Sequence, residues 1–274
     1  MNLSRFQTKT GPRWVADDGG LPEGLTLGFL LELPFDEMLD VLRALPRESV
    51  ELGKPLSPVE DDQEVWAAGV TYLRSRVERE AESAVADVYA KVYEAERPEI
   101  FFKSVGWRTV GHGECIRIRR DSKWNVPEPE LTVVINRHRQ IVGYTAGNDV
   151  SSRSIEGDNP LYLPQAKTYD GSCAVGPGII LCSDVDMANL PIHVSISAFG
   201  FEVFAGDANT GQMKRSLLDL ASYLCRETTF PRGVFLMTGT GIVPGPEFTL
   251  APMHRVSITV GEVTLENEVA APFP

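Results

Sequence analysis

Three carboxylates and a lysine stand out between residues 127 and 170 of this sequence. Glu128 and Glu130 flank a proline, Asp149 follows later in the chain, and Lys167 lies beyond it. On a strand, alternate side chains point to the same face, so Glu128 and Glu130 project together. Carboxylate oxygens bind hard cations such as Mg²⁺, Mn²⁺ or Ca²⁺, and a nearby amine can transfer protons. The pattern indicates a cation site with a catalytic amine beside it.

The segments around the pair predict that Asp149 joins it. The apolar runs Leu131–Ile135 and Ile141–Ala146 are separated by residues 136–140, which are typical of a hairpin loop. In an antiparallel hairpin, paired positions sum to a constant, which places Glu128 opposite residues 147–149. Three carboxylates that meet repel one another, and a bound cation removes that repulsion. Mg²⁺ also keeps coordination positions open for substrate oxygens. Since a Glu-x-Glu pair alone is common on solvated strands, the prediction depends on the hairpin.

The rest of the sequence predicts a β-rich α+β fold. Short apolar or alternating runs between Gly and Pro turns favour a mostly antiparallel sheet assembly over a βαβ repeat. Helices are expected over 35–45, about 73–96 and about 213–226, where apolar residues recur on one face. The other expected strands cover residues 5–8, 13–16, 65–70, 100–102, 115–119, 178–182, 193–199, 201–204, 234–237 and 256–260.

The chain is expected to form two units. Residues 1–60 read as a small N-terminal domain, and residues 61–274 as the catalytic domain. The segment Gly53–Asp62, with two prolines and three acidic residues, is the expected linker.

Composition limits the classes of function. The formal net charge of −12 over 274 residues argues against a nucleic-acid-binding protein, which would present a basic face. No apolar run reaches the length of a membrane span, and the N-terminus has no signal-peptide core, so a cytoplasmic protein is expected. The four cysteines lack zinc-ligand spacing and are expected to be reduced thiols.

The residues around Asp149 resemble a known family. The segment Gly143–Arg153 is similar to the signature of the fumarylacetoacetate hydrolase superfamily, and the Glu-x-Glu pair lies upstream as in that family. The motifs Phe101–Lys103, Gly176–Gly178 and Thr238–Thr240 match in the same order, and the resemblance covers roughly residues 60–274. It implies a mixed β-sandwich roll with a small N-terminal domain, bound Mg²⁺, and a homodimer or homotetramer.

A narrower resemblance points to one branch. The segments Arg97–Lys103, Pro127–Leu131, Asn159–Lys167 and Thr240–Gly245 are similar to the branch that contains 2-keto-3-deoxy-D-arabinonate dehydratase. The resemblance assigns roles to seven residues: metal ligands Glu128, Glu130 and Asp149; catalytic Lys167 and Glu99; substrate-binding Thr240 and Arg153.

The branch implies a Mg²⁺-dependent dehydratase acting on a small 2-keto acid. A 2-keto-3-deoxy sugar acid, such as 2-keto-3-deoxy-D-arabinonate, would form an enolate, lose its C4 hydroxyl and give 2,5-dioxopentanoate. Lys167 would serve as base or as partner of the enolate, and Glu99 would deliver a proton to the leaving hydroxyl. The sequence leaves open which of the two is base and which is acid.

Two other readings remain. One is a metal-dependent C–C hydrolase of acylpyruvates or fumarylacetoacetate, or an oxaloacetate decarboxylase. Hydrolases of the family usually carry a histidine where this chain has Ser75, which argues against water attack. The other is a catalytically silent protein that uses the metal for structure or binds a metabolite. The presence of Lys167 beside all three carboxylates argues against that second reading.

Overall fold

The computed structural model describes residues 1–17, 19–74 and 91–271. Its strands are β1 (Asn2–Thr8), β2 (Gly11–Ala16), β3 (Gly19–Gly20), β4 (Pro55–Leu56), β5 (Glu64–Gly69), β6 (Glu99–Val105), β7 (Cys115–Ile116), β8 (Asn125–Val126), β9 (Pro129–Ile135), β10 (Ile141–Asp149), β11 (Ser151–Ser152), β12 (Cys173–Leu181), β13 (Pro191–Ala198), β14 (Phe201–Asn209), β15 (Val234–Met237), β16 (Arg255–Val260) and β17 (Val263–Val269).

The helices of the described chain are short. They include the α-helices α1 (Leu27–Leu30), α2 (Phe35–Ala44), α5 (Arg153–Asp158), α6 (Leu163–Lys167) and α7 (Leu217–Leu224), and the 3₁₀ helices Gly106–Arg108, Pro160–Tyr162, Asp184–Met187 and Thr210–Gln212. None of the helices in these described ranges is long and apolar enough to cross a membrane.

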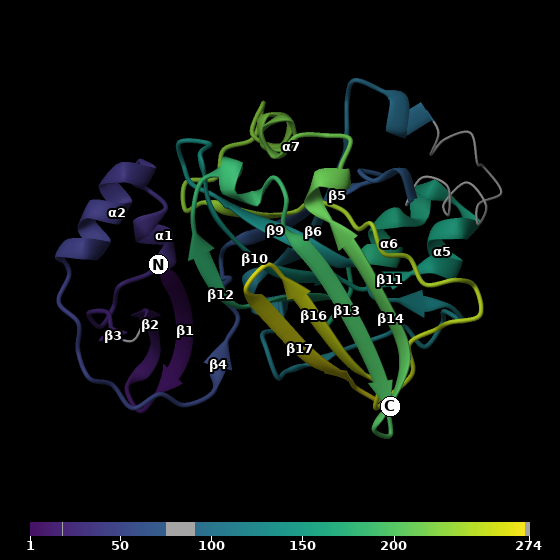
Figure 1. Cartoon of the computed structure of the whole chain (residues 1–274), viewed down its shortest axis with the longest axis horizontal. Helices are drawn as coiled ribbons and strands as arrows, with labels where there is room; N and C mark the ends of the chain where they lie inside the picture. Colours follow the sequence, from purple (N-terminus) through teal and green to yellow (C-terminus); the bar gives the residue numbers. More distant parts are fainter. Residues whose placement is uncertain (18, 75–90, 272–274) are drawn as a thin grey trace.

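Two mixed sheets dominate the molecule (Figure 1). The large sheet has the order β3-β2-β1-β12-β10-β9-β15-β5-β6, with β4 pairing β1, and the second sheet has the order β14-β13-β16-β17-β7. Strand pairs in the described chain are antiparallel, except that β15 runs parallel to β5 and β17 runs parallel to β7. The predicted β-rich, mostly antiparallel fold is therefore confirmed.

The central strands β9 and β10 are buried along their whole length because both faces of the large sheet are covered. On one face, Leu131 and Val133 belong to a core shared with Val194 of the second sheet. On the other face, Val134 belongs to a core shared with Leu30 of α1. Strands covered on both sides read as continuous apolar runs, as these do. The site strands are thereby held at the centre of the fold.

The N-terminal segment contributes to the same large sheet. Strand β1 pairs antiparallel with β12, with Leu3 opposite Ile179. The predicted helix over 35–45 is present as α2, which buries Met38 and Leu42. The predicted division of the chain at residue 60 stays a prediction.

Some predicted elements differ from the observed ones. Only the first two residues of the predicted strand 115–119 are in a strand, because the chain then turns and Arg117 N bonds Gly171 O. The helix expected over 213–226 begins at Leu217, where Ser216 caps it by accepting a hydrogen bond from Asp219 N. Strand β17 and helices α5 and α6 were not predicted. The predicted helix 73–96 lies mostly outside the described residues.

Candidate active site

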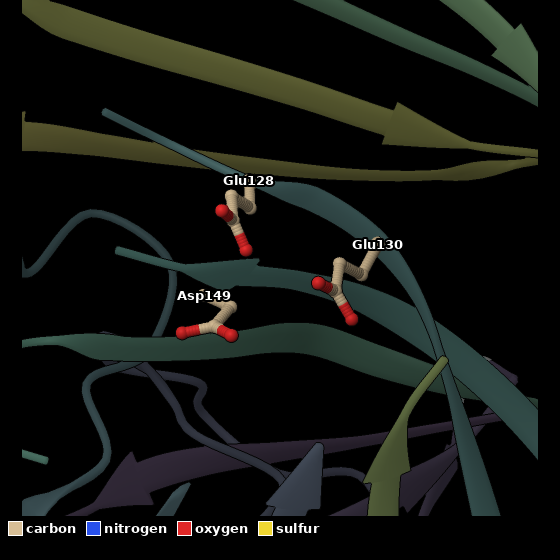
Figure 2. Close-up of side chains that lie close together, drawn as sticks. All are labelled: Glu128, Glu130 and Asp149. Atoms are coloured by element: carbon tan, nitrogen blue, oxygen red, sulfur yellow. The ribbon is translucent and has the colours of Figure 1, made fainter. Parts of the chain in front are cut away.

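The predicted carboxylate cluster forms where β9 begins and β10 ends. Gly147 lies opposite Glu130 in the ladder, and Asp149 N donates a hydrogen bond to Glu128 O at 3.0 Å. The hairpin register is therefore the predicted one. Figure 2 shows the three side chains turned toward one another. Their ligand oxygens lie within 4.8 Å of one another, and all three residues are buried.

Among the three carboxylates, the negative charge of Glu130 is the one least balanced by nearby positive charge from the described residues. Burial, followed by the negative charges of Asp149 and Glu128, raises its pKa well above the usual value. Its Oε2 accepts a hydrogen bond from Gly239 N at 2.6 Å, but no ion pair within 4.0 Å reaches it from the described residues. A cation at this position would stabilise the charged form. Three carboxylate donors suit a hard divalent cation.

Lys167, the last residue of α6, holds the other two carboxylates. Its Nζ lies 2.6 Å from Glu128 Oε2 and 3.0 Å from Asp149 Oδ2, and it donates to Ser151 Oγ at 2.6 Å. The side chain is buried, and its ammonium lies 5.7 Å from the ring centre of Phe101. The amine predicted from sequence is thus placed directly at the carboxylates.

A second buried lysine supports Asp149 from the opposite side. Lys103, on β6, is fully buried, and its Nζ lies 2.6 Å from Asp149 Oδ1. The same ammonium donates to Lys167 O at 2.5 Å and to Val150 O at 3.2 Å. Lys103 therefore fixes one carboxylate and the backbone that carries Lys167. No role was expected for it from the sequence, although a lysine that follows two phenylalanines in a buried strand is itself a signal.

Arg153 and Glu156 lie one turn apart on α5. Arg153 Nη2 donates to Glu128 Oε1 at 2.8 Å, and its Nε is 3.9 Å from Glu156 Oε2. Both residues are buried, but only Glu156 is among the residues that line the cavity beside the triad. The substrate contact predicted for Arg153 stays a prediction, and its observed partners are carboxylates of the protein.

The cavity beside the triad brings together the remaining predicted residues. Glu99, at the start of β6, and Thr240, after β15, both line it. Gly69 lies opposite Glu99 in the ladder, and a Cβ at Gly69 would lie 2.0 Å from Glu99 Oε2. Thr240 Oγ1 donates to Ile242 O at 3.1 Å, which fixes the hydroxyl at the wall. Ser75, which distinguishes hydrolysis from elimination in the sequence, lies outside the described residues.

Comparison with known families gives a direct assignment. The family model described as fumarylacetoacetate (FAA) hydrolase C-terminal matches residues 64–270, which is most of the chain. The chain belongs to the fumarylacetoacetate hydrolase family. Its family membership agrees with the signature at Gly143–Arg153 and with the fold described above.

Several of the proteins that the chain resembles are dehydratases. A probable 2-keto-3-deoxyxylonate dehydratase of Haloferax volcanii is 49% identical over 76% of this chain and 73% of that protein. A 2-dehydro-3-deoxy-D-arabinonate dehydratase of Saccharolobus solfataricus is 42% identical over 81% of this chain and 75% of that protein. A solved structure of 2-keto-3-deoxy-D-arabinonate dehydratase, complexed with magnesium and 2,5-dioxopentanoate, superposes with a TM-score of 0.81 at 33% identity over 98% of this chain and 99% of that chain.

Proposed function

We propose that this protein is a Mg²⁺-dependent dehydratase that converts a 2-keto-3-deoxy sugar acid, such as 2-keto-3-deoxy-D-arabinonate, into 2,5-dioxopentanoate. The observation that carries the proposal is the buried triad of Glu128, Glu130 and Asp149 with the Lys167 amine bound to two of its members. The names of the similar family members, and the ligands of the solved complex, support the same reaction.

Glu128, Glu130 and Asp149 would hold the cation. The fit rests on their donor type, on their mutual proximity and on the poorly compensated charge of Glu130. When bound, Mg²⁺ supplies a Lewis acid that polarises a 2-keto group and acidifies the protons at C3. Arg153 and Lys103 keep Glu128 and Asp149 in place from outside the cavity.

The protein's own groups then move two protons. One group removes a proton from C3, the C3–H electron pair becomes part of a new double bond, and the C4–O bond breaks. A second group protonates the departing hydroxyl, so that water leaves and a C3–C4 double bond remains. Tautomerisation then moves a proton from C5 to C3 and the proton of the C5 hydroxyl to C4, which leaves the aldehyde at C5. Lys167 and Glu99 are the two groups, since both line the cavity beside the triad. Thr240, which also lines the cavity, orients the substrate.

Product identification by NMR tests the proposal. Purified protein is incubated with 2-keto-3-deoxy-D-arabinonate, with Mg²⁺ or with a chelator. The expected product is 2,5-dioxopentanoate, formed only with the metal. Release of pyruvate would instead support a C–C cleaving enzyme, and binding without turnover would support a metabolite-binding protein.

Two further features belong to the proposal. Residues 1–60 are proposed as a small N-terminal domain that docks on the catalytic domain through β1 and β12. A homodimer or homotetramer is proposed for the assembled enzyme. Light scattering on the purified protein measures its molar mass, and a value near that of a single 30.1 kDa chain would contradict the assembly.

A further inference from the structure

We infer that Glu156 makes this site selective against 2-keto acids whose far end carries a second negative charge. The inference rests on the proposed function, since it concerns the part of the substrate that extends beyond the 2-keto acid group. Glu156 is 2% exposed, and among the described residues it is one of two carboxylates, with Glu99, that line the cavity outside the proposed metal triad. Neither the triad nor the proposed proton transfers use it.

The placement of Arg153 and Glu156 decides the charge of the wall. A guanidinium facing the cavity would attract a distal carboxylate of the substrate. Here Arg153 is directed to Glu128 at 2.8 Å, and Glu156 takes the position on the cavity wall. The Arg153 guanidinium also lies 3.9 Å from Glu156 Oε2, so both side chains of this helix are fixed beside the cavity. Of these two side chains, the cavity therefore presents the Glu156 carboxylate, a hydrogen-bond acceptor, and not the Arg153 guanidinium.

This wall accepts one kind of group and rejects another. A carboxylate only accepts hydrogen bonds, so it binds the hydroxyls of a sugar acid. It repels a second carboxylate, and in a buried site that repulsion is far stronger than in water. Among the described residues that line the cavity, Lys167 is the single basic one, and it is already bound to Glu128 and Asp149. Selectivity thus comes from an unfavourable contact with the wrong ligand as well as a favourable one with the right ligand.

Three ligands of equal carbon number isolate the effect. Binding of 2-oxopentanoate, 5-hydroxy-2-oxopentanoate and 2-oxoglutarate to the Mg²⁺-loaded protein is measured by titration calorimetry. The ligands share the 2-keto acid group and differ at C5 by a methyl, a hydroxymethyl or a carboxylate. The wild-type protein is expected to bind 2-oxoglutarate at least tenfold more weakly than 2-oxopentanoate, and the hydroxylated ligand more tightly than either.

Glu156→Gln is the decisive variant, because it keeps the shape of the side chain and removes its charge. The dissociation constant of 2-oxoglutarate is divided by that of 2-oxopentanoate, and we expect the variant to lower this ratio by about tenfold. The affinity for 2-oxopentanoate itself should change little. Asp158→Asn is the matched control, since it removes one negative charge from the exposed side of the same helix and should leave all three affinities unchanged.

The outcomes separate this inference from the proposed function. If 2-oxopentanoate fails to bind with Mg²⁺ present, the 2-keto acid site itself is wrong and the inference falls with it. If 2-oxopentanoate binds but Glu156→Gln leaves the ratio unchanged, only the role of Glu156 is wrong. If the variant does not fold, the affinities of the wild-type protein still test the inference. Tighter binding of 2-oxoglutarate than of 2-oxopentanoate by the wild-type protein would overturn it.

Discussion

The carboxylates of the site and two of the cations that hold them, Arg153 and Lys167, come from two regions that are built differently. Glu128, Glu130 and Asp149 belong to β9, β10 and the link just before β9, at the centre of the large sheet. Arg153 and Lys167 lie on α5 and α6, which have six and five residues and are too short to be stable alone. Hydrogen bonds between strands fix the positions of the carboxylates, whereas the positions of the cations on the two short helices depend on the contacts that their side chains make. The two regions should therefore respond differently to substitution.

The largest effect is expected from the strand region. Asp149→Asn removes one proposed metal ligand and the charge that two lysines share. We expect Mg²⁺ binding, measured by calorimetry, to be lost and kcat/KM to fall by about 10⁴-fold. Asp158→Asn on the exposed side of α5 is the control. Near-normal Mg²⁺ affinity in Asp149→Asn would show that Asp149 is not a ligand.

Lys167→Met tests the helix region, and here binding and turnover should separate. Removal of the ammonium leaves Glu128 and Asp149 with less compensating charge, so Mg²⁺ affinity should be unchanged or higher. Loss of a proton-transferring group should lower kcat by about 10³-fold. Lys123→Met, at an exposed position, is the control. A variant that keeps Mg²⁺ and turns over at nearly the normal rate would remove Lys167 from the mechanism.

Lys103→Met tests the connection between the two regions, because Lys103 contacts both Asp149 and the carbonyl of Lys167. The substitution removes one positive charge from a buried carboxylate and one donor from two backbone carbonyls, so the free energy of unfolding should fall by about 3–5 kcal/mol. The activity of the remaining folded protein should fall by about 10²-fold, as for residues that orient metal ligands. Urea unfolding and kinetics check the two effects. Unchanged stability would mean that the buried ion pair adds nothing to the fold.

The smallest effect is expected at Gly69. A methyl group added there would displace the Glu99 carboxylate, because the new Cβ would lie 2.0 Å from Glu99 Oε2. We expect Gly69→Ala to lower kcat by about tenfold with little change in Mg²⁺ affinity. In a Glu99→Gln background the same substitution should add almost nothing, because both changes act on one side chain. Additive losses in the double variant would show that Gly69 acts in another way.

The strand region was predictable because its geometry follows from simple rules. A period of two places Glu128 and Glu130 on one face, and a hairpin turn at residues 136–140 fixes their register with Asp149. These rules require only the local pattern. The period of two is also present in β17, where Val263, Leu265 and Val269 alternate with polar residues. This strand could therefore have been predicted from the sequence as well.

The helix region was not predictable from pattern. Helices of five or six residues show no full apolar period, so α5 and α6 left no helical signature. Lys167 was noticed for its position after the carboxylates, whereas Arg153 and Glu99 were found through the family resemblance, which gives positions but not contacts. Hence the direction of Arg153 toward Glu128, and the part of Lys103 in the site, emerge only from the packing of distant segments.

Each carboxylate of the triad has at least one oxygen already engaged by the protein. Gly239 N holds Glu130 Oε2, Arg153 holds Glu128 Oε1, and Lys103 lies against Asp149 Oδ1. Lys167 lies against the second oxygen of Glu128 and of Asp149, so these two carboxylates are held at both oxygens. A divalent cation at the triad would share those oxygens with Lys167, and the two positive charges would repel each other. The affinity of the site for its ion should therefore reflect a competition between that ion and the ammonium group.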